Sequence, residues 1–235
     1  MSVLESGSNH SSCYRGNLKV FGMSIGKDDK EYDMSFSTGG LFRLESGKLA
    51  ALYQQFRDWQ DVRGHAMAHN VLQTRIQSTA KRLLWEVISR LQTLNVAELD
   101  LLTDAKTDEK SLFLWIAVCR RYRFIAEFAL EVMREKMNSG TPLLNEDFDA
   151  YFSHKSEWNE RLEAIRPTTR MKLRQVLFRM LHEAEFLDTM NQVVSVLPSQ
   201  RLVTVLYHEH RNDLLFLPIL ESDLIRIRDE FRSQQ

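Results

Sequence analysis

Two stretches of the chain are rich in basic side chains, which bind the phosphates of nucleic acids. Residues 161–182 hold six Lys or Arg and one acidic residue, and residues 41–92 hold eight basic and four acidic residues, in a chain whose net charge is −1. Basic side chains gain affinity for a duplex by releasing the counterions of its phosphates. Both stretches therefore predict binding to double-stranded DNA.

If both stretches are helical, the side chains that would meet DNA follow from a turn of 100° per residue. The polar face within residues 41–92 then carries Arg75, Lys81, Arg82 and Arg90, which suit phosphate contacts. The polar face within residues 161–182 carries Arg170, Lys172, Arg174, Gln175 and Arg179. Only Gln175, Arg179 and the neighbouring His182 are placed to read base edges, so we expect a weak sequence preference.

The same basic faces have other interpretations. They could be solvated, or they could form ion pairs with residues 93–160, which hold 13 acidic and eight basic residues. Charge blocks of opposite sign could also dock partner proteins. A further alternative is a stacking platform for single-stranded nucleic acid among the aromatic and Arg residues between Trp115 and Phe128. Helical spacing favours a place in the core for Trp115 and Phe128 instead.

Catalytic and metal-binding patterns are missing from the sequence. It contains no phosphate-binding loop, no dinucleotide fingerprint and no nucleophile elbow. His65 and His69 have the spacing of two zinc ligands, but Ala66 occupies the position where a metalloprotease needs Glu. The polar residues between His208 and Asp213 are helix neighbours that do not face one another. We therefore expect no enzyme, no bound metal and no cofactor.

Hydrophobic spacing predicts a mainly helical chain. With 9 Gly and 4 Pro among 235 residues, the chain is too poor in turn residues for a sandwich or barrel. Helices are expected over residues 41–56, 59–69, 72–94, 109–136, 145–152, 156–165, 168–187, 199–209 and 221–235, and an apolar face is clearest over 72–94, 109–136 and 168–187. The expected fold class is all-α.

Two of these segments have the spacing of DNA-binding units. Residues 59–94 are compatible with a helix-turn-helix. After the helix over 168–187, a turn at 188–192 and a β-branched stretch at 193–196 follow in the order of a winged helix. We therefore expect an all-α fold with a short β wing, in two helical subdomains with helix-turn-helix and winged-helix-like elements.

The expected domain boundary lies at Asn138–Pro142, where Gly140 and Pro142 end the longest helix. This gives a flexible N-terminal arm (1–33), an N-terminal helical domain (34–138) and a C-terminal winged-helix-like domain (139–235). Two distant cysteines, Cys13 and Cys119, favour a cytoplasmic protein. Residues 1–14 lack the pattern of a signal peptide. The longest apolar run has eight residues, 112–119, whereas a membrane span needs about 20, so no membrane segment is expected.

Four segments together resemble one known family. They are SFSTGGLF (35–42), NVLQTRIQSTAKRLLWEVISRL (70–91), LFLWIAVCRRYRFIAEFALEV (112–132) and TTRMKLRQVLFRMLHEA (168–184). In this order they resemble BrxA, the small helical component of bacterial bacteriophage-exclusion (BREX) defence systems. The resemblance spans roughly residues 32–220, nearly all of the chain beyond the N-terminal arm.

The resemblance implies a non-enzymatic accessory protein of phage defence, with an all-α fold, winged-helix-like elements and DNA binding as its activity. It implies other BREX proteins as possible partners. A comparison of the family with RNA antitermination factors keeps RNA binding as an alternative, beside a scaffold that only docks partner proteins. No catalytic residue is implied by the resemblance.

Overall fold

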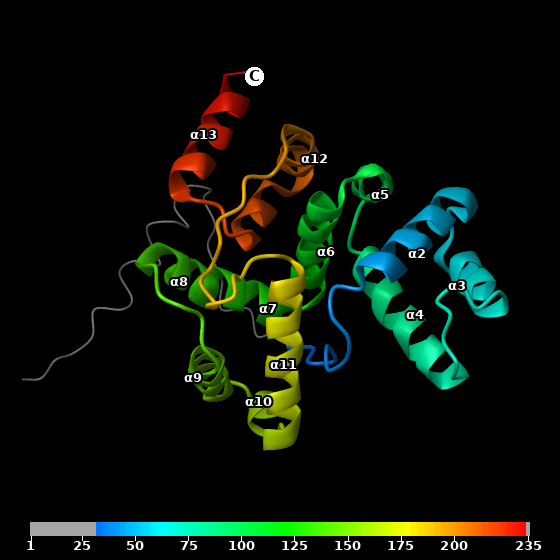
Figure 1. Cartoon of the computed structure of the whole chain (residues 1–235), viewed down its shortest axis with the longest axis horizontal. Helices are drawn as coiled ribbons and strands as arrows, with labels where there is room; N and C mark the ends of the chain where they lie inside the picture. The colour runs from blue at the N-terminus through cyan, green and yellow to red at the C-terminus, as the bar shows by residue number, and fades with distance from the viewer. Residues whose placement is uncertain (1–31, 234–235) are drawn as a thin grey trace, which may run out of the picture.

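The computed structural model describes residues 32–233, which fold mainly into α-helices (Figure 1). In chain order these are α2 (Arg43–Phe56), α3 (Trp59–Ala68), α4 (Gln77–Leu91), α5 (Val96–Asp104), α6 (Thr107–Arg121), α7 (Arg123–Phe128), α8 (Arg134–Ser139), α9 (Asn145–Ser156), α10 (Glu160–Glu163), α11 (Pro167–Glu183), α12 (Gln200–His210) and α13 (Glu221–Arg232). Residues 32–233 contain no β-strand. The all-α prediction is confirmed for this part of the chain.

Several helices begin at side chains that accept hydrogen bonds from the otherwise unpaired N–H groups of the first turn. Asp58, Asn159 and Ser199 cap α3, α10 and α12 in this way. At α5, Asn95 and Glu98 form a reciprocal capping box. Hydrophobic spacing alone did not predict α5, although this pair of residue types is a sequence signal for a helix start.

The prediction of one continuous helix over 109–136 is wrong. The helix ends at Arg121, because Tyr122 leaves the helical conformation (φ −122°, ψ 94°), and α7 begins at the next residue. A π-helical turn, Ala129–Met133, then joins α7 to α8. The Tyr122 hydroxyl donates to the buried Glu86 carboxylate of α4, at 2.6 Å. A tertiary contact therefore accompanies a break that local propensity did not signal.

The predicted strand over 193–196 is also wrong. After α11 the chain turns back with one isolated antiparallel bridge between Leu187 and Val193. The Val194 N–H then donates to the Phe186 carbonyl and the Val196 N–H to the Pro218 carbonyl, so the segment runs extended without forming a ladder. The β wing is not formed in the described part of the chain.

The hydrophobic core is continuous on both sides of residue 138. The Trp115 ring of α6 meets Phe186 edge-on, and its indole N–H donates to the Phe216 carbonyl at 2.8 Å. The Phe124 ring of α7 packs edge-on against Phe148 of α9. Side chains from both predicted helical domains thus pack in one core. The division at residue 138 stays a prediction.

Residues 32–42, which we name the N-terminal strap, cross several helices without forming one themselves. Phe36 is fully buried beside Tyr122 and Phe124. The Tyr32 hydroxyl donates to Glu127, at 2.6 Å. Apart from Tyr32 and Asp33, the predicted flexible arm over 1–33 lies outside the described residues.

Figure 1 shows how this order of elements places the two basic helices. Helices α2, α3 and α4 gather at one end of the molecule, α12 and α13 lie at another side, and α9 and α10 lie beside the N-terminal end of α11. Helices α4 and α11 approach each other near their C-terminal ends and separate toward their N-terminal ends. The two predicted DNA-binding helices thus form a V.

Candidate nucleic-acid interface

Helix α11 carries its cations on one side and its core residues on the other. Leu173, Val176, Leu177, Met180 and Leu181 are buried, while Lys172, Gln175, Arg179 and His182 are exposed. Pro167 starts the helix at a position where its missing N–H costs nothing. The predicted polar face is therefore solvent-accessible at these four residues.

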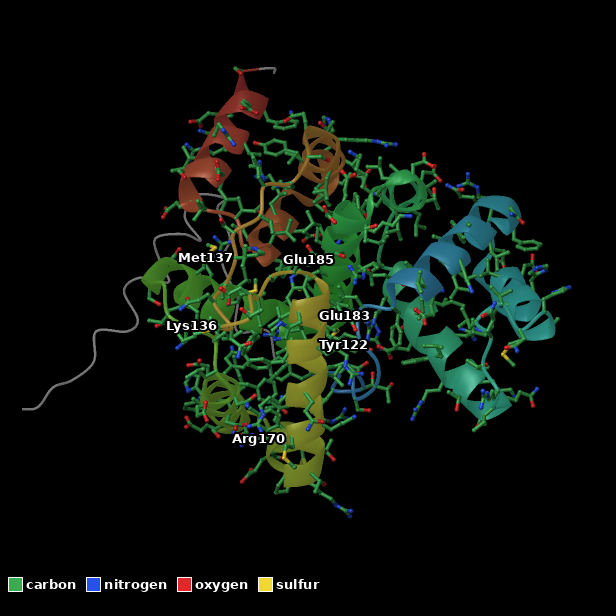
Figure 2. All side chains as sticks on the ribbon, in the orientation of Figure 1. Tyr122, Lys136, Met137, Arg170, Glu183 and Glu185 are labelled. Atoms are coloured by element: carbon green, nitrogen blue, oxygen red, sulfur yellow. The ribbon has the colours of Figure 1, made fainter. Side chains whose placement is uncertain are left out.

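Two further predicted residues of α11 are partly engaged within the protein. Arg170 and Arg174 both form ion pairs with Asp149 of α9. The Arg170 guanidinium also lies 4.7 Å from the centre of the Phe152 ring, near the N-terminal end of α11 (Figure 2). Because one carboxylate faces two guanidinium groups, this cluster keeps a net positive charge while it fastens α9 to α11.

The cations of α4 divide into two groups. Arg75, just before the helix, and Lys81 and Arg82 in its N-terminal half are exposed and form no ion pair with other residues of 32–233. Exposed cations without carboxylate partners leave a net positive potential at the surface. This end of α4 is the second candidate surface for binding a polyanion.

The prediction that Arg90 lies on the exposed face of α4 is wrong. Its side chain is buried, with 3% of the residue exposed, and it forms an ion pair with Glu86 at 2.6 Å. It also donates to the Gly40 carbonyl at 2.7 Å and lies 5.1 Å from the centre of the Phe42 ring. The strap and Met180 of α11 cover this end of the helix, which the spacing within α4 could not reveal.

The strap joins the C-terminal ends of the two basic helices. The Leu41 N–H donates to the Glu183 carboxylate of α11 at 2.6 Å, one residue after the carbonyl that Arg90 of α4 binds. A Cβ atom on Gly40 would lie 2.2 Å from a Glu183 oxygen, so a larger residue at this position would displace the carboxylate. Glu183 is the last residue of α11 and is labelled in Figure 2. Sequence reasoning missed Glu183, and the Gly39-Gly40 pair was the only local signal for it.

A buried hydrogen bond from the Tyr122 hydroxyl to the Glu86 carboxylate lies beside this junction. Burial and the adjacent Glu86 carboxylate raise the pKa of Tyr122 to about 12. The hydroxyl therefore stays protonated at neutral pH and donates to Glu86. A donor held in this way satisfies a carboxylate that would otherwise be costly to bury.

The other sequence candidates for chemistry have structural partners. The Asp213 carboxylate forms an ion pair with Arg120, which also binds the buried Glu98 with two hydrogen bonds. Burial raises the pKa of Asp213 against the opposing effect of Arg120. The rings of His65 on α3 and His69, which follows the helix, stack with their centres 4.1 Å apart. Within residues 32–233 no three His, Cys, Asp or Glu side chains are grouped to hold a metal.

The stacking platform considered between Trp115 and Phe128 is not available to a ligand. Trp115, Tyr122, Phe124 and Phe128 are all fully buried. The interpretation of Trp115 and Phe128 as core residues is confirmed.

Comparison with known proteins decides the family. A sequence model of the BrxA family matches residues 30–210. The chain belongs to the BrxA family. Only the segment after α12, including α13, follows the matched region. The positions of α4 and α11 both lie inside it.

Two relatives and one solved structure extend the family assignment. The BREX protein BrxA of Bacillus cereus (strain H3081.97) is 26% identical over 161 residues, which cover 68% of this chain and 80% of the relative. The BREX protein BrxA of Escherichia coli O9:H4 (strain HS) is 25% identical over 187 residues, covering 77% and 88%. The crystal structure of an uncharacterized protein from Magnetospirillum magneticum has a TM-score of 0.71 at 19% identity and covers 81% of this chain and 99% of that chain. This last similarity shows that the fold is shared.

The described part of this BrxA-family chain offers no membrane-spanning element. Among residues 32–233 no helix combines the length and the apolar character that crossing a bilayer requires.

Proposed function

We propose that this chain is a non-enzymatic component of a BREX phage-defence system that binds double-stranded DNA through α11 and α4. Membership of the BrxA family, with two relatives named as BREX proteins, supports the place in phage defence. The DNA-binding part is carried by one observation: Lys172 and Arg179 on α11, and Arg75, Lys81 and Arg82 at α4, are exposed and lack ion-pair partners within residues 32–233. In a chain with 32 acidic side chains, leaving these cations unpaired favours an external anion.

Phosphate contacts would supply most of the affinity. About five cationic contacts, most of them to phosphates, give a salt dependence that weakens binding roughly 10²–10³-fold between 50 and 200 mM salt. Gln175, Arg179 and His182 are the exposed residues that would read base edges, so discrimination between sequences would be small. The protein would position partner proteins on DNA without modifying it. The proposal includes a cytoplasmic location, a helix-turn-helix role for the segment that holds α3 and α4, and a winged-helix-like role for α11 without the β wing.

The test is a titration of a labelled 25-base-pair duplex, followed by fluorescence anisotropy at 50 and 200 mM salt. The double variant Lys172→Gln/Arg179→Gln should weaken binding and make the salt dependence shallower by about two cationic contacts, because Lys172 at a phosphate and Arg179 at a base edge would each displace counterions. The matched control is Arg226→Gln/Arg228→Gln on α13, which removes the same charge from residues already paired with Asp223 and Asp229. Equal affinity of wild type and the α11 variant, with the fold intact, contradicts the assignment to α11.

A docking role for partner proteins is the second candidate, and the exposed Trp158 favours it. This residue is 83% exposed in the turn between α9 and α10, and large exposed aromatic residues are typical of protein interfaces. Co-purification with other BREX proteins after nuclease treatment, and its loss in Trp158→Ala, would test this role. Competition of duplex DNA against structured RNA of equal length separates the DNA proposal from RNA binding.

A further inference from the structure

Trp85 is an exposed aromatic residue on the face of α4 that carries the free cations. It keeps 44% of its surface exposed. Lys81 and Arg82 lie four and three residues before it, spacings that make them its neighbours on the helix surface. The ring and the two cations therefore form one contiguous surface.

A second helix holds the Trp85 ring in place. The guanidinium of Arg121, in the last turn of α6, lies over the Trp85 ring at 5.7 Å from its centre, within the range of a cation–π contact. Arg121 is itself fixed by an ion pair with Asp33 of the strap and lies 5.0 Å from the centre of the Tyr122 ring. The indole is thus fixed in orientation before any ligand arrives, although nearly half of it faces solvent.

We propose that Trp85 is a stacking platform for an unpaired base of a DNA strand whose phosphates are bound by Lys81 and Arg82. This inference rests on the proposed DNA binding and names the form of DNA that the α4 surface takes. An aromatic ring beside basic side chains is the arrangement that binds single strands, because every base offers a flat face and every nucleotide a phosphate. In an intact duplex the bases are paired and stacked, so the ring would find an unpaired base only at a gap, a bubble or a single-stranded tail.

Charge separates Trp85 from the other strongly exposed tryptophan. Trp158 is more exposed than Trp85, but Glu157 and Glu160 flank it and both are exposed. Carboxylates repel a phosphate backbone, whereas Lys81 and Arg82 attract it. Trp158 is therefore the control: a tryptophan of greater exposure with the carboxylates Glu157 and Glu160 beside it.

The experiment compares three DNA probes of one sequence: a blunt 25-base-pair duplex, the same duplex with a four-nucleotide single-stranded gap, and the single strand alone. Binding is measured by anisotropy, and stacking by quenching of tryptophan fluorescence. The variants are Trp85→Leu, Trp85→Phe and Trp158→Leu, each checked for helical content and unfolding temperature. Wild type should bind the gapped duplex more tightly than the blunt one.

The expected result is specific to the gapped and single-stranded probes. Trp85→Leu should weaken binding to them roughly 5–100-fold, the range found when one stacked base loses its aromatic partner, and should remove most of the quenching. Binding of the blunt duplex should change little. Trp85→Phe should recover most of the affinity because it restores a flat ring, and Trp158→Leu should behave as wild type.

Three results would overturn the inference and leave the proposed function standing. They are unchanged binding of the gapped duplex by Trp85→Leu, an equal loss on all three DNA probes, and tighter binding of a single-stranded RNA of the same sequence with the same quenching. Failure of wild type to bind any DNA probe would instead overturn the proposed function together with this inference.

Discussion

Arg82 and Arg90 lie two turns apart on the same helix and have opposite surroundings. Arg82 is exposed and unpaired within the described residues, whereas Arg90 is buried against Glu86, Gly40 and the Phe42 ring. The N-terminal half of α4 is an open cationic surface, and its C-terminal half is part of the junction with the strap and α11. The residue type alone therefore does not tell a phosphate ligand from a structural ion pair; the segment that covers the helix decides between them.

The largest effect on stability is expected when the buried Arg90 is replaced. Arg90→Ala leaves the buried Glu86 carboxylate without its cation, and breaking a buried pair costs about 3–5 kcal/mol. Arg82→Ala, on the open half, should change the free energy of unfolding by less than about 0.5 kcal/mol. Urea unfolding followed by circular dichroism measures both. Similar stability of the two variants would contradict the division of α4 into an open and a covered half.

A second prediction compares the contributions of α4 and α11 to DNA binding. If α4 and α11 contact one duplex together, Lys81→Gln/Arg82→Gln should make the salt dependence of DNA binding shallower by about two contacts, as expected for the α11 variant. The quadruple variant should lose about four contacts. Anisotropy titrations at four salt concentrations measure these slopes. A quadruple variant no weaker than either double variant would mean that only one of the two helices meets DNA.

The junction itself is tested by a glycine that touches Glu183. Gly40→Ala places a methyl group where the Glu183 carboxylate lies, so the hydrogen bond from the Leu41 N–H is lost, at a cost of about 1–3 kcal/mol. The matched control is Gly47→Ala in α2, where an added Cβ meets no atom within 4 Å and alanine favours the helix. Thermal unfolding should therefore occur at lower temperature in the first variant and at equal or higher temperature in the second.

The smallest effect concerns pH and a carboxylate beside the strap. Burial raises the pKa of Glu127, but hydrogen bonds from Lys155 and Tyr32 outweigh it, and the pKa is held below its usual value. Because the folded-state pKa is lowered, this group stabilises the protein above the unfolded pKa of about 4.3, and that stability is lost as pH falls through the folded pKa. Glu127→Gln should flatten the decline of unfolding temperature between pH 5 and 3. An unchanged slope would show that Glu127 is not linked to acid unfolding.

Helices that bury one simple apolar stripe could be predicted from the sequence. For α3, α11 and α12 the expected and observed ends differ by four residues or fewer, because the spacing of their apolar residues is set by contact with one core. The break at Tyr122 and the burial of Arg90 could not be predicted in the same way. Both arise from contacts with segments distant in sequence, Glu86 for Tyr122 and Gly40 for Arg90. Periodicity gives the direction of a side chain and does not reveal what covers it.

The residues of the candidate site also fall into those that one helix alone determines and those that depend on contacts between helices. The exposed positions of Lys172, Gln175 and Arg179 follow from one helix and its period, so sequence analysis could place them. The pairing of Arg170 and Arg174 with Asp149 depends on how α9 lies against α11. Trp85 was not singled out, because its partner Arg121 lies on another helix and only the fold brings the two together.

The bonds made by Gly40 and Leu41 have a mechanical consequence. One peptide group binds the side chain of α4 through its carbonyl and the side chain of α11 through its N–H, so the angle between the two helices is clamped at their convergent ends. The distance between the N-terminal ends of the two helices is then fixed by the fold. A polyanion laid across both would meet cations at a preset span and would not have to bring them into register, which removes an entropic cost of association.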